Sequence, residues 1–473
     1  MRQRTGEREL RGRRVADRPV GGGRSATAVA VVLPIAFGVL AWVGAGAGAA
    51  PGDASTPAVD LAAVDRVDLL CPPTPGAGGT VRVARPDVGA EQAQESVLRA
   101  GSPGDLDVSF DVPLGASVGP DRGTGQLALR AEGGGAPGVF ADALVTSATS
   151  GLAAASCPAP GTSWWFSGGG ADADHRSALT LTNLDQGPAV VDIRLHGVDG
   201  PLPAESLRGV TLAPGDTRTW AWADVVPGQA HLTVEVRVVR GRVAATSREE
   251  GAGAEWPAAG APPGARQQVP AVPAGPGRSV LTVTNPGQTP TRATVRVVTD
   301  TGAFVPLELG EVFVEPGAVA SLDLTEALGA DAAAVEVTAD AEVVAGLRKT
   351  VRSARDVATV PATPPLTGTG AVGAGPGRTV LHLSAGEDGA VAEVAAVGAD
   401  GGTVAEERFS IRSSSLVTWV VPPEAAYVVV EPIRGAPYAA AARSGQDSGV
   451  AVVPVAPLPL DRIVPQVLPQ SES

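Results

Sequence analysis

The 473-residue chain has few of the side chains that most often build active sites. Aromatic residues make up 3% of it, and Lys349 is the single lysine. The four histidines, His175, His196, His231 and His382, are scattered without the H-x-x-H spacing that a zinc site needs. We therefore predict no metal, no cofactor and no enzymatic activity. His196 and His382 lie in alternating strand patterns, so we expect both side chains to face solvent.

Charged residues are absent from residues 25–52, a run of 28 residues. A run of this length can cross a bilayer of about 30 Å as a helix. Residues 1–24 carry eight arginines against three acidic residues, and this net charge of +5 predicts a basic cytoplasmic arm. We predict a single transmembrane helix with the C-terminal body outside the cytoplasm. A signal sequence cleaved at its A-x-A sites, which would secrete the body, is the alternative.

The body of the protein is acidic. Removing the +5 of the arm from the total of −14 leaves −19 on residues 25–473. Such a charge repels nucleic acid, so we predict no nucleic-acid partner. The partners that we expect are the membrane, through the N-terminal helix, and the cell wall or other envelope proteins.

The chain holds two cysteines, Cys71 and Cys157, and both fall in the exported part. In an oxidising compartment an even pair is most simply a disulfide. A metal pair would need His or Cys neighbours, and redox chemistry usually uses a C-x-x-C motif, so both alternatives are weaker. We predict a disulfide between them.

Internal repeats organise the rest of the chain. The motif LTLTN begins at Leu179, LTVTN begins at Leu281 and LHLSA begins at Leu381, so the period is close to one hundred residues. The only two asparagines, Asn183 and Asn285, occupy the same place in this motif. With 61 Gly and 42 Pro, the sequence favours short strands joined by turns over long helices.

Proline-containing boundary motifs mark the ends of the repeats: CPAP at 157, VPAVP at 269, VPATP at 360 and VPVAP at 453. They predict β units over residues 65–160 (divergent, with the disulfide), 161–265, 266–365 and 366–457, then a flexible Pro-rich tail over 458–473. Each unit offers six or seven short alternating strands. We predict an all-β fold of tandem immunoglobulin-like β-sandwich units after one N-terminal transmembrane helix. A propeller with two blades per unit, eight in all, is the alternative.

Two motifs invite a functional interpretation. Residues 115–119 match G-x-S-x-G, which would make Ser117 the nucleophile of a serine hydrolase. A turn rather than a helix is expected after Ser117, so this is a remote alternative. Trp164, Trp165 and Phe166 form the densest aromatic cluster. Exposed, they would be a ligand contact for wall polysaccharide, but we favour a buried core anchor because large aromatics are usually buried.

The layout resembles domain-of-unknown-function family 5719 of exported actinobacterial proteins. The resemblance is carried by SWWFSGGG (163–170), ALTLTN, an alternating strand, APGDTRTW and VAATSRE, after a basic arm, a membrane segment and a Cys-Pro pair. It covers roughly residues 25–455 and implies a cell-envelope protein without an assigned activity. We therefore expect a membrane-anchored scaffold or protein-interaction module. A wall polysaccharide or peptidoglycan-binding module that uses Trp164 and Trp165 is the alternative.

Overall fold

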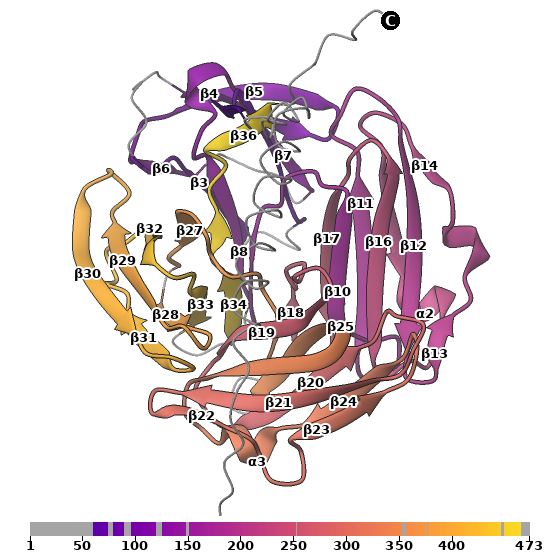
Figure 1. The fold of residues 1–473 in the computed structure, drawn as a ribbon. Coiled ribbons are helices and arrows are strands. Elements are labelled where there is room, and N and C mark those ends of the chain that lie inside the picture. Colours follow the sequence, from indigo (N-terminus) through magenta and orange to yellow (C-terminus); the bar gives the residue numbers. More distant parts are fainter. Residues whose placement is uncertain are drawn as a thin grey trace, which may run out of the picture. The chain divides into compact units, whose positions relative to one another are not determined.

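The structure is a computed structural model that describes residues 60–73, 79–88, 96–119, 125–147, 151–251, 253–351, 356–375, 377–445 and 449–464. The chain divides into two units, Leu61–Ile463 and the two chain ends, Met1–Asp60 with Val464–Ser473. The first unit is all-β, as the sequence predicts (Figure 1). The predicted cytoplasmic arm and membrane or signal segment lie outside the described residues. Within the described ranges, no helix is long and apolar enough to cross a membrane.

Each repeat contributes two antiparallel sheets of four or five strands that face each other across a shared core. In repeat 1 (65–160) the sheets have the orders β2-β7-β4-β5 and β9-β8-β3-β6. Its strands are β2 (Arg66–Cys71), β3 (Gly79–Ala84), β4 (Ser96–Ser102), β5 (Asp105–Val112), β6 (Ser117–Val118), β7 (Leu127–Glu132), β8 (Phe140–Ser147) and β9 (Gly151–Ser156).

Repeat 2 (161–265) has the orders β10-β16-β12-β13, with β14 also on β12, and β18-β17-β11-β15. Its strands are β10 (Ser163–Gly169), β11 (Arg176–Thr182), β12 (Ala189–Gly197), β13 (Gly200–Leu202), β14 (Val210–Leu212), β15 (Thr217–Ala221), β16 (Leu232–Arg240), β17 (Ala244–Glu250) and β18 (Ala254–Glu255). Its helical turns are short: η2 (Glu205–Leu207) and α2 (Trp222–Val225).

Repeat 3 (266–365) is built on one long strand, β25 (Ala333–Val351). The first half of β25 pairs with β19 and β21, and its second half pairs with β20 and β26, so one strand serves both sheets. The other elements are β19 (Gly264–Val272), β20 (Gly277–Thr284), β21 (Thr291–Thr299), β22 (Gly302–Phe304), β23 (Glu311–Val314), β24 (Val319–Asp323), β26 (Asp356–Pro361) and α3 (Thr325–Leu328).

Repeat 4 (366–457) has the orders β30-β29-β32-β27-β35 and β31-β28-β33-β34. Its strands are β27 (Gly370–Gly373), β28 (Arg378–Ser384), β29 (Ala390–Val397), β30 (Thr403–Ile411), β31 (Leu416–Val420), β32 (Tyr427–Arg434), β33 (Tyr438–Ser444), β34 (Val450–Pro454) and β35 (Ala456–Pro457). The remaining elements are η1 (Gly133–Gly135) in repeat 1 and the paired strands β1 (Asp60–Ala63) and β36 (Asp461–Val464).

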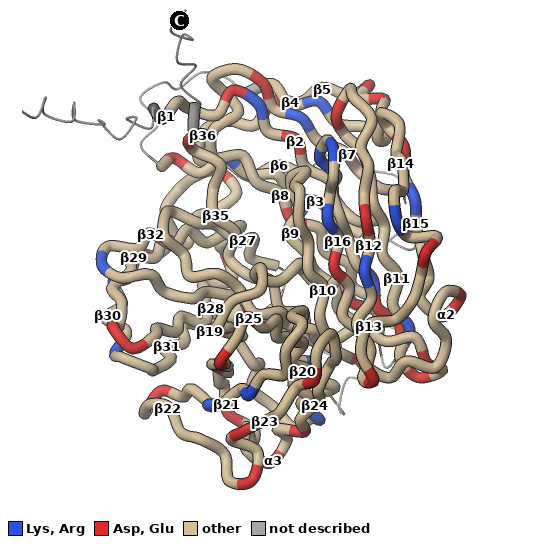
Figure 2. Tube along the Cα trace, turned by 45° about the vertical axis from the view of Figure 1, so that its right-hand side comes forward, with Lys and Arg blue, Asp and Glu red and all other residues tan. Residues whose placement is uncertain are grey.

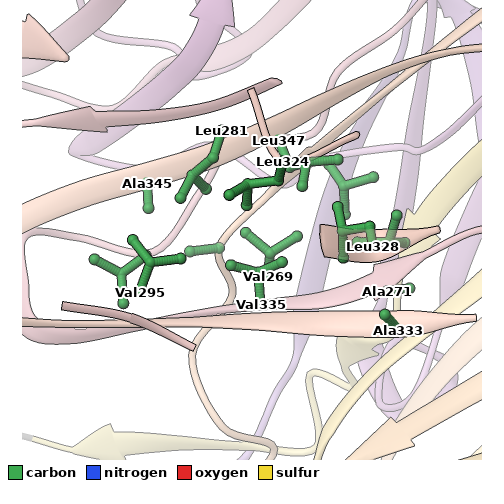
Figure 3. Close-up of a cluster of buried hydrophobic side chains, with 14 of the residues drawn as sticks. Val269, Ala271, Leu281, Val295, Leu324, Leu328, Ala333, Val335, Ala345 and Leu347 are labelled. Atoms are coloured by element: carbon green, nitrogen blue, oxygen red, sulfur yellow. The ribbon is translucent and has the colours of Figure 1, made fainter. Parts of the chain in front are cut away.

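Small aliphatic side chains fill the space between the two sheets of a repeat. Figure 3 shows the core of repeat 3, where Leu281 and Leu347 of one sheet meet Val295 and Val335 of the other. Every buried side chain of this core is Val, Ala or Leu. Close packing therefore depends on β-branched and methyl groups, as the scarcity of aromatic residues predicts.

The two asparagines of the repeated motif make the same hydrogen bonds in repeats 2 and 3. Asn183 Nδ2 donates to the carbonyl oxygens of Gly187 at 2.8 Å and Leu212 at 3.1 Å. Asn285 Nδ2 donates to the carbonyl oxygens of Thr289 at 2.8 Å and Val314 at 3.1 Å. Each asparagine thus hydrogen-bonds both its own turn and the neighbouring strand. The motif therefore recurs because it stabilises the same turn in both repeats.

Neighbouring repeats pack directly against each other and share buried contacts. Leu70 of repeat 1 packs on Leu184 of repeat 2 in a small buried cluster. Between repeats 2 and 3, the buried hydroxyls of Thr233 and Thr284 are 2.7 Å apart. These contacts use the outer faces of the sheets, so both faces of the participating sheets are covered.

The last repeat returns to the first and closes a ring within Leu61–Ile463. Gln268 Nε2 of repeat 3 donates to Ser384 Oγ of repeat 4 at 3.3 Å. The Tyr427 hydroxyl of repeat 4 donates to the carbonyl oxygen of Gly115 in repeat 1. In Figure 1 the orange and yellow strands of repeat 4 lie beside the indigo strands of repeat 1.

A buried ion pair secures this closing junction. Arg443 Nη2 lies 3.1 Å from Asp142 Oδ2, and both side chains are almost fully buried. Asp142 also accepts hydrogen bonds from Ser156 Oγ at 2.8 Å and from the backbone N–H of Gly373. Such hydrogen bonds offset the cost of removing the two charges from water.

The result is eight sheets around one axis. The strands β9, β18, β26 and β34, one from each repeat, lie next to one another at the centre. Two sheets per repeat around a common axis is the arrangement of an eight-bladed propeller, the alternative that the sequence left open. Strands of the two sheets are interleaved along the chain in each repeat, so a blade is not formed by four consecutive strands.

The prediction that His196 and His382 face solvent is wrong. Their side chains are 5% and 1% exposed, respectively. His196 Nδ1 lies 3.1 Å from the carbonyl oxygen of Gly317 in the next repeat. Both histidines occupy outward-facing strand positions, which the ring covers with a neighbouring repeat.

The tail also differs from the prediction over residues 458–464. The backbone N–H of Leu458 donates to Thr369 O at 2.9 Å, and the N–H of Gly138 donates to Pro459 O at 3.1 Å. Residues Asp461–Val464 then form β36 beside β1. This part of the predicted flexible tail is therefore ordered, because it returns to repeat 1; residues 465–473 lie outside the described residues.

Candidate functional site

The boundary segments of the four repeats meet around one cavity at the centre of the ring. Strands β9, β18, β26 and β34 lead directly into residues 157–159, 256–259, 363–366 and 455–459, and all four segments line the cavity. Its volume is about 380 Å³. We call it the proline-lined pocket. The motifs that punctuate the sequence at domain spacing are therefore neighbours in space.

The wall of this pocket is apolar and rich in proline. None of its lining residues is charged, and the polar ones are Ser156, Thr246, Ser247 and Thr363. Eight prolines contribute: Pro72, Pro158, Pro257, Pro364, Pro365, Pro454, Pro457 and Pro459. In Figure 2, β35, which carries the lining residues Ala456 and Pro457, is drawn without charged positions.

The aromatic cluster on β10 is split between two environments. Trp164 is half-buried and borders the pocket, with its indole N–H donating to Val243 O at 3.2 Å. Trp165 and Phe166 are both 5% exposed. Phe166 belongs to the core of repeat 2, whereas Trp165 stacks on His196 with ring centroids 5.9 Å apart. Because strand side chains alternate, the two tryptophans point to opposite faces and form no shared platform.

Sequence reasoning missed a second tryptophan of the pocket. Trp256 lies in the segment between repeats 2 and 3, borders the pocket and is 4% exposed. It packs in the core of repeat 1 with Cys71 and Cys157. The signal was present: a Trp-Pro pair stands alone in a linker otherwise made of Gly, Ala, Pro and Glu. A large side chain in such a linker indicates that the linker is buried.

The predicted disulfide is confirmed. Cys71 ends β2 and is bonded to Cys157, which follows β9, with the two Cα atoms 4.4 Å apart. Cys157 and Pro72 both line the pocket. The bond therefore fixes one side of the pocket wall as well as the entry and exit of repeat 1.

At the other end of β9, β26 and β34, a single carboxylate lies on the axis. Asp356 Oδ2 accepts hydrogen bonds from the backbone N–H groups of Leu152 at 3.1 Å and Val450 at 2.8 Å. Burial raises the pKa of Asp356. A Cβ placed on Gly253 would lie 2.1 Å from Asp356 Oδ1, and Gly449 is equally close to Oδ2. The equivalent positions of neighbouring repeats are thus glycines that make room for this carboxylate.

Ser117 of the G-x-S-x-G match begins β6. It pairs with Ala84 of β3, and its backbone N–H donates to Ala399 O of repeat 4 at 3.0 Å. Among the described residues no histidine is hydrogen-bonded to Ser117. The described ranges also contain no group of three His, Cys, Asp or Glu side chains that could hold a metal ion.

A protein-family model matches a large part of this chain. Residues 115–423, about two thirds of the sequence, match the model of a family of unknown function, DUF5719. The chain belongs to this family. The DUF5719 match runs from the G-x-S-x-G segment to the end of β31 and just beyond, and includes three of the four pocket segments. No curated protein matches the chain.

Proposed function

We propose that this DUF5719 chain is a non-enzymatic, exported cell-envelope protein held in the membrane by a helix over residues 25–52. The basic arm and the uncharged run support the anchor and its orientation. The Cys71–Cys157 disulfide supports an oxidising compartment, since such bonds are rare where thiols are kept reduced.

Its role is that of an interaction module that holds one component of the envelope in the proline-lined pocket. The observation that carries this proposal is the convergence of all four boundary segments on one apolar cavity. A largely preformed concave site with apolar walls is the usual form of a ligand-binding site. The ring, the disulfide and the fixed φ angles of the prolines reduce the ordering cost of binding.

Wall polysaccharide remains the second candidate, through Trp164 alone. Trp165 is buried against His196, so the tryptophan pair cannot act together without rearranging repeat 2. Half-buried Trp164 keeps an edge on the pocket, where a sugar ring could stack.

The test is photo-crosslinking in intact cells. The photoreactive residue p-benzoylphenylalanine would replace Pro364, which is exposed at the pocket, and in a control Val239, which is 62% exposed on β16. We expect a discrete adduct from position 364 and none from position 239. An adduct from position 239 alone, or from neither position, would refute the pocket as the functional site.

A further inference from the structure

We infer that the proline-lined pocket binds an acyl chain, the hydrocarbon part of a fatty acid or membrane lipid. This inference rests on the proposed function and names the class of ligand. The alternatives of comparable size are an apolar peptide segment and a sugar. Three features of the pocket wall separate these ligands: its lack of charge, its short supply of hydrogen-bond donors and the buried, unpaired hydroxyl of Thr363.

The first feature is the absence of charge from the lining. No Asp, Glu, Lys or Arg borders the cavity, so the site has nothing to pair with a charged ligand. The volume of about 380 Å³ falls in the range of ligand pockets, roughly 300–1,000 Å³. Enclosed apolar cavities stay dry and accept apolar ligands. A hydrocarbon chain gains about 0.8 kcal/mol for each CH₂ group that it buries.

The second feature is a shortage of donors. Eight of the lining residues are prolines, which have no backbone N–H. Ser156 Oγ donates to Asp142, Ser247 Oγ donates to Ala178 O at 3.4 Å, and the Trp164 indole donates to Val243 O. These three donors are already used within the protein; the other side-chain donors of the lining are the hydroxyls of Thr246 and Thr363 and the indole N–H of Trp256.

That shortage discriminates between the ligands. A peptide would bring a carbonyl oxygen with every residue, and a sugar would bring several hydroxyls. Each group that found no partner would cost about 1–3 kcal/mol. A hydrocarbon chain has no such polar groups, so this cost does not arise.

The third feature is Thr363 at the start of the segment between repeats 3 and 4. Its Oγ1 atom is buried and has no hydrogen-bond partner in the described structure. This buried hydroxyl suits one oxygen, such as that of a carboxyl or ester group at the end of an acyl chain. Beside it, Pro364 and Pro365 are exposed, so the head of the ligand can remain in water.

The experiment uses the full chain in phosphatidylcholine vesicles. One sample contains a fatty acid with a diazirine near its methyl end, and the other contains phosphatidylcholine with the same labelled chain. After irradiation, labelled peptides are mapped by mass spectrometry. We expect label on the peptides that carry Trp164 and Trp256, and the two samples distinguish a free fatty acid from a membrane lipid as the source.

Two variants test whether the cavity takes the label. Ala258→Trp fills the cavity, and Ala159→Leu narrows it from an exposed position that tolerates substitution. Ala213→Trp, on an exposed turn away from the pocket, is the matched control. Labelling should fall at least tenfold in Ala258→Trp and several-fold in Ala159→Leu, and stay unchanged in Ala213→Trp. Circular dichroism must first show that each variant keeps its β structure.

Label from either probe on the pocket peptides, lost in the two pocket variants, supports the inference. Label elsewhere, equal label in all variants, or no label from both probes overturns it. The proposed function is judged separately by the adduct at position 364 in cells. A protein or sugar adduct there would preserve the proposed function and refute the acyl chain.

Discussion

His382 should make the ring sensitive to acid. Its side chain is buried, on the face of β28 where Ser384 accepts a hydrogen bond from Gln268 of repeat 3, and burial lowers its pKa to about 4. In the unfolded chain a histidine has a pKa of about 6.5. Between these two values the unfolded chain binds a proton that the folded protein does not, so the free energy of unfolding falls as the pH falls.

The magnitude follows from the gap between the two pKa values. About 2.5 pH units at about 1.4 kcal/mol each give a full loss of about 3.5 kcal/mol, of which about 3 kcal/mol is reached at pH 4. The loss begins near pH 6.5 and is complete below about pH 4. Buried acids act in the opposite sense: burial raises the pKa of Glu255, so its folded form binds the extra proton and is favoured at low pH. A single pH profile therefore mixes both effects.

A comparison of wild type with His382→Leu isolates the histidine. Leucine fills a similar volume and does not titrate. Urea unfolding followed by tryptophan fluorescence at pH 7, 6, 5 and 4 gives the free energy of unfolding of each protein. The difference between variant and wild type should shift by about 3 kcal/mol in favour of the variant from pH 7 to pH 4. A difference that stays constant with pH would refute the assignment of a buried, neutral His382.

Three further outcomes follow from the structure. Replacing Cys71 and Cys157 together by serine should lower the free energy of unfolding by about 4–5 kcal/mol, measured in urea, because the bond closes a loop with a sequence separation of 86 residues. Arg443→Met should cost about 3–5 kcal/mol by the same assay, since it leaves a buried carboxylate unpaired. Gly253→Ala should lower the melting temperature by crowding Asp356, and Asp356→Gly in the same chain should restore part of the loss. Additive losses in that pair would contradict the packing of the axis.

Local rules predict the interior of each repeat well. Alternating strands, turn glycines and the Asn183 and Asn285 motif follow from short-range chemistry, and they place the strands and the all-β class. The disulfide was predictable because the predicted export would place the two cysteines in an oxidising compartment, where an even pair leaves few alternatives. The strands and turns depend on residues that are close in sequence, and the disulfide is the one pairing that two cysteines allow.

The ring was harder to predict because it depends on the outward faces of the sheets. A strand covered on both faces shows a weaker alternation, and small polar residues there, such as Thr233, can face either water or another hydroxyl. Strand alternation alone places His196 and His382 on the outward faces of their strands, but it cannot show that the ring buries those faces. The pocket could not be predicted at all, because it is formed by segments that lie about one hundred residues apart.

The divergence of the repeats at their boundaries has a physical cause in this geometry. The asparagine motif lies away from the axis, where each copy has its own space and can keep the same side chain. At the axis, the four copies share one space. Asp356 fits only because glycines approach it from neighbouring repeats, where an added Cβ would come within about 2.1–2.3 Å of its carboxylate. Four identical large side chains would collide there, so the central positions must differ from repeat to repeat. The same constraint gives the pocket an asymmetric wall, because the four boundary segments contribute different side chains, among them a single tryptophan, Trp256. An asymmetric wall can hold an asymmetric ligand in one orientation, which a ring of four equal repeats could not.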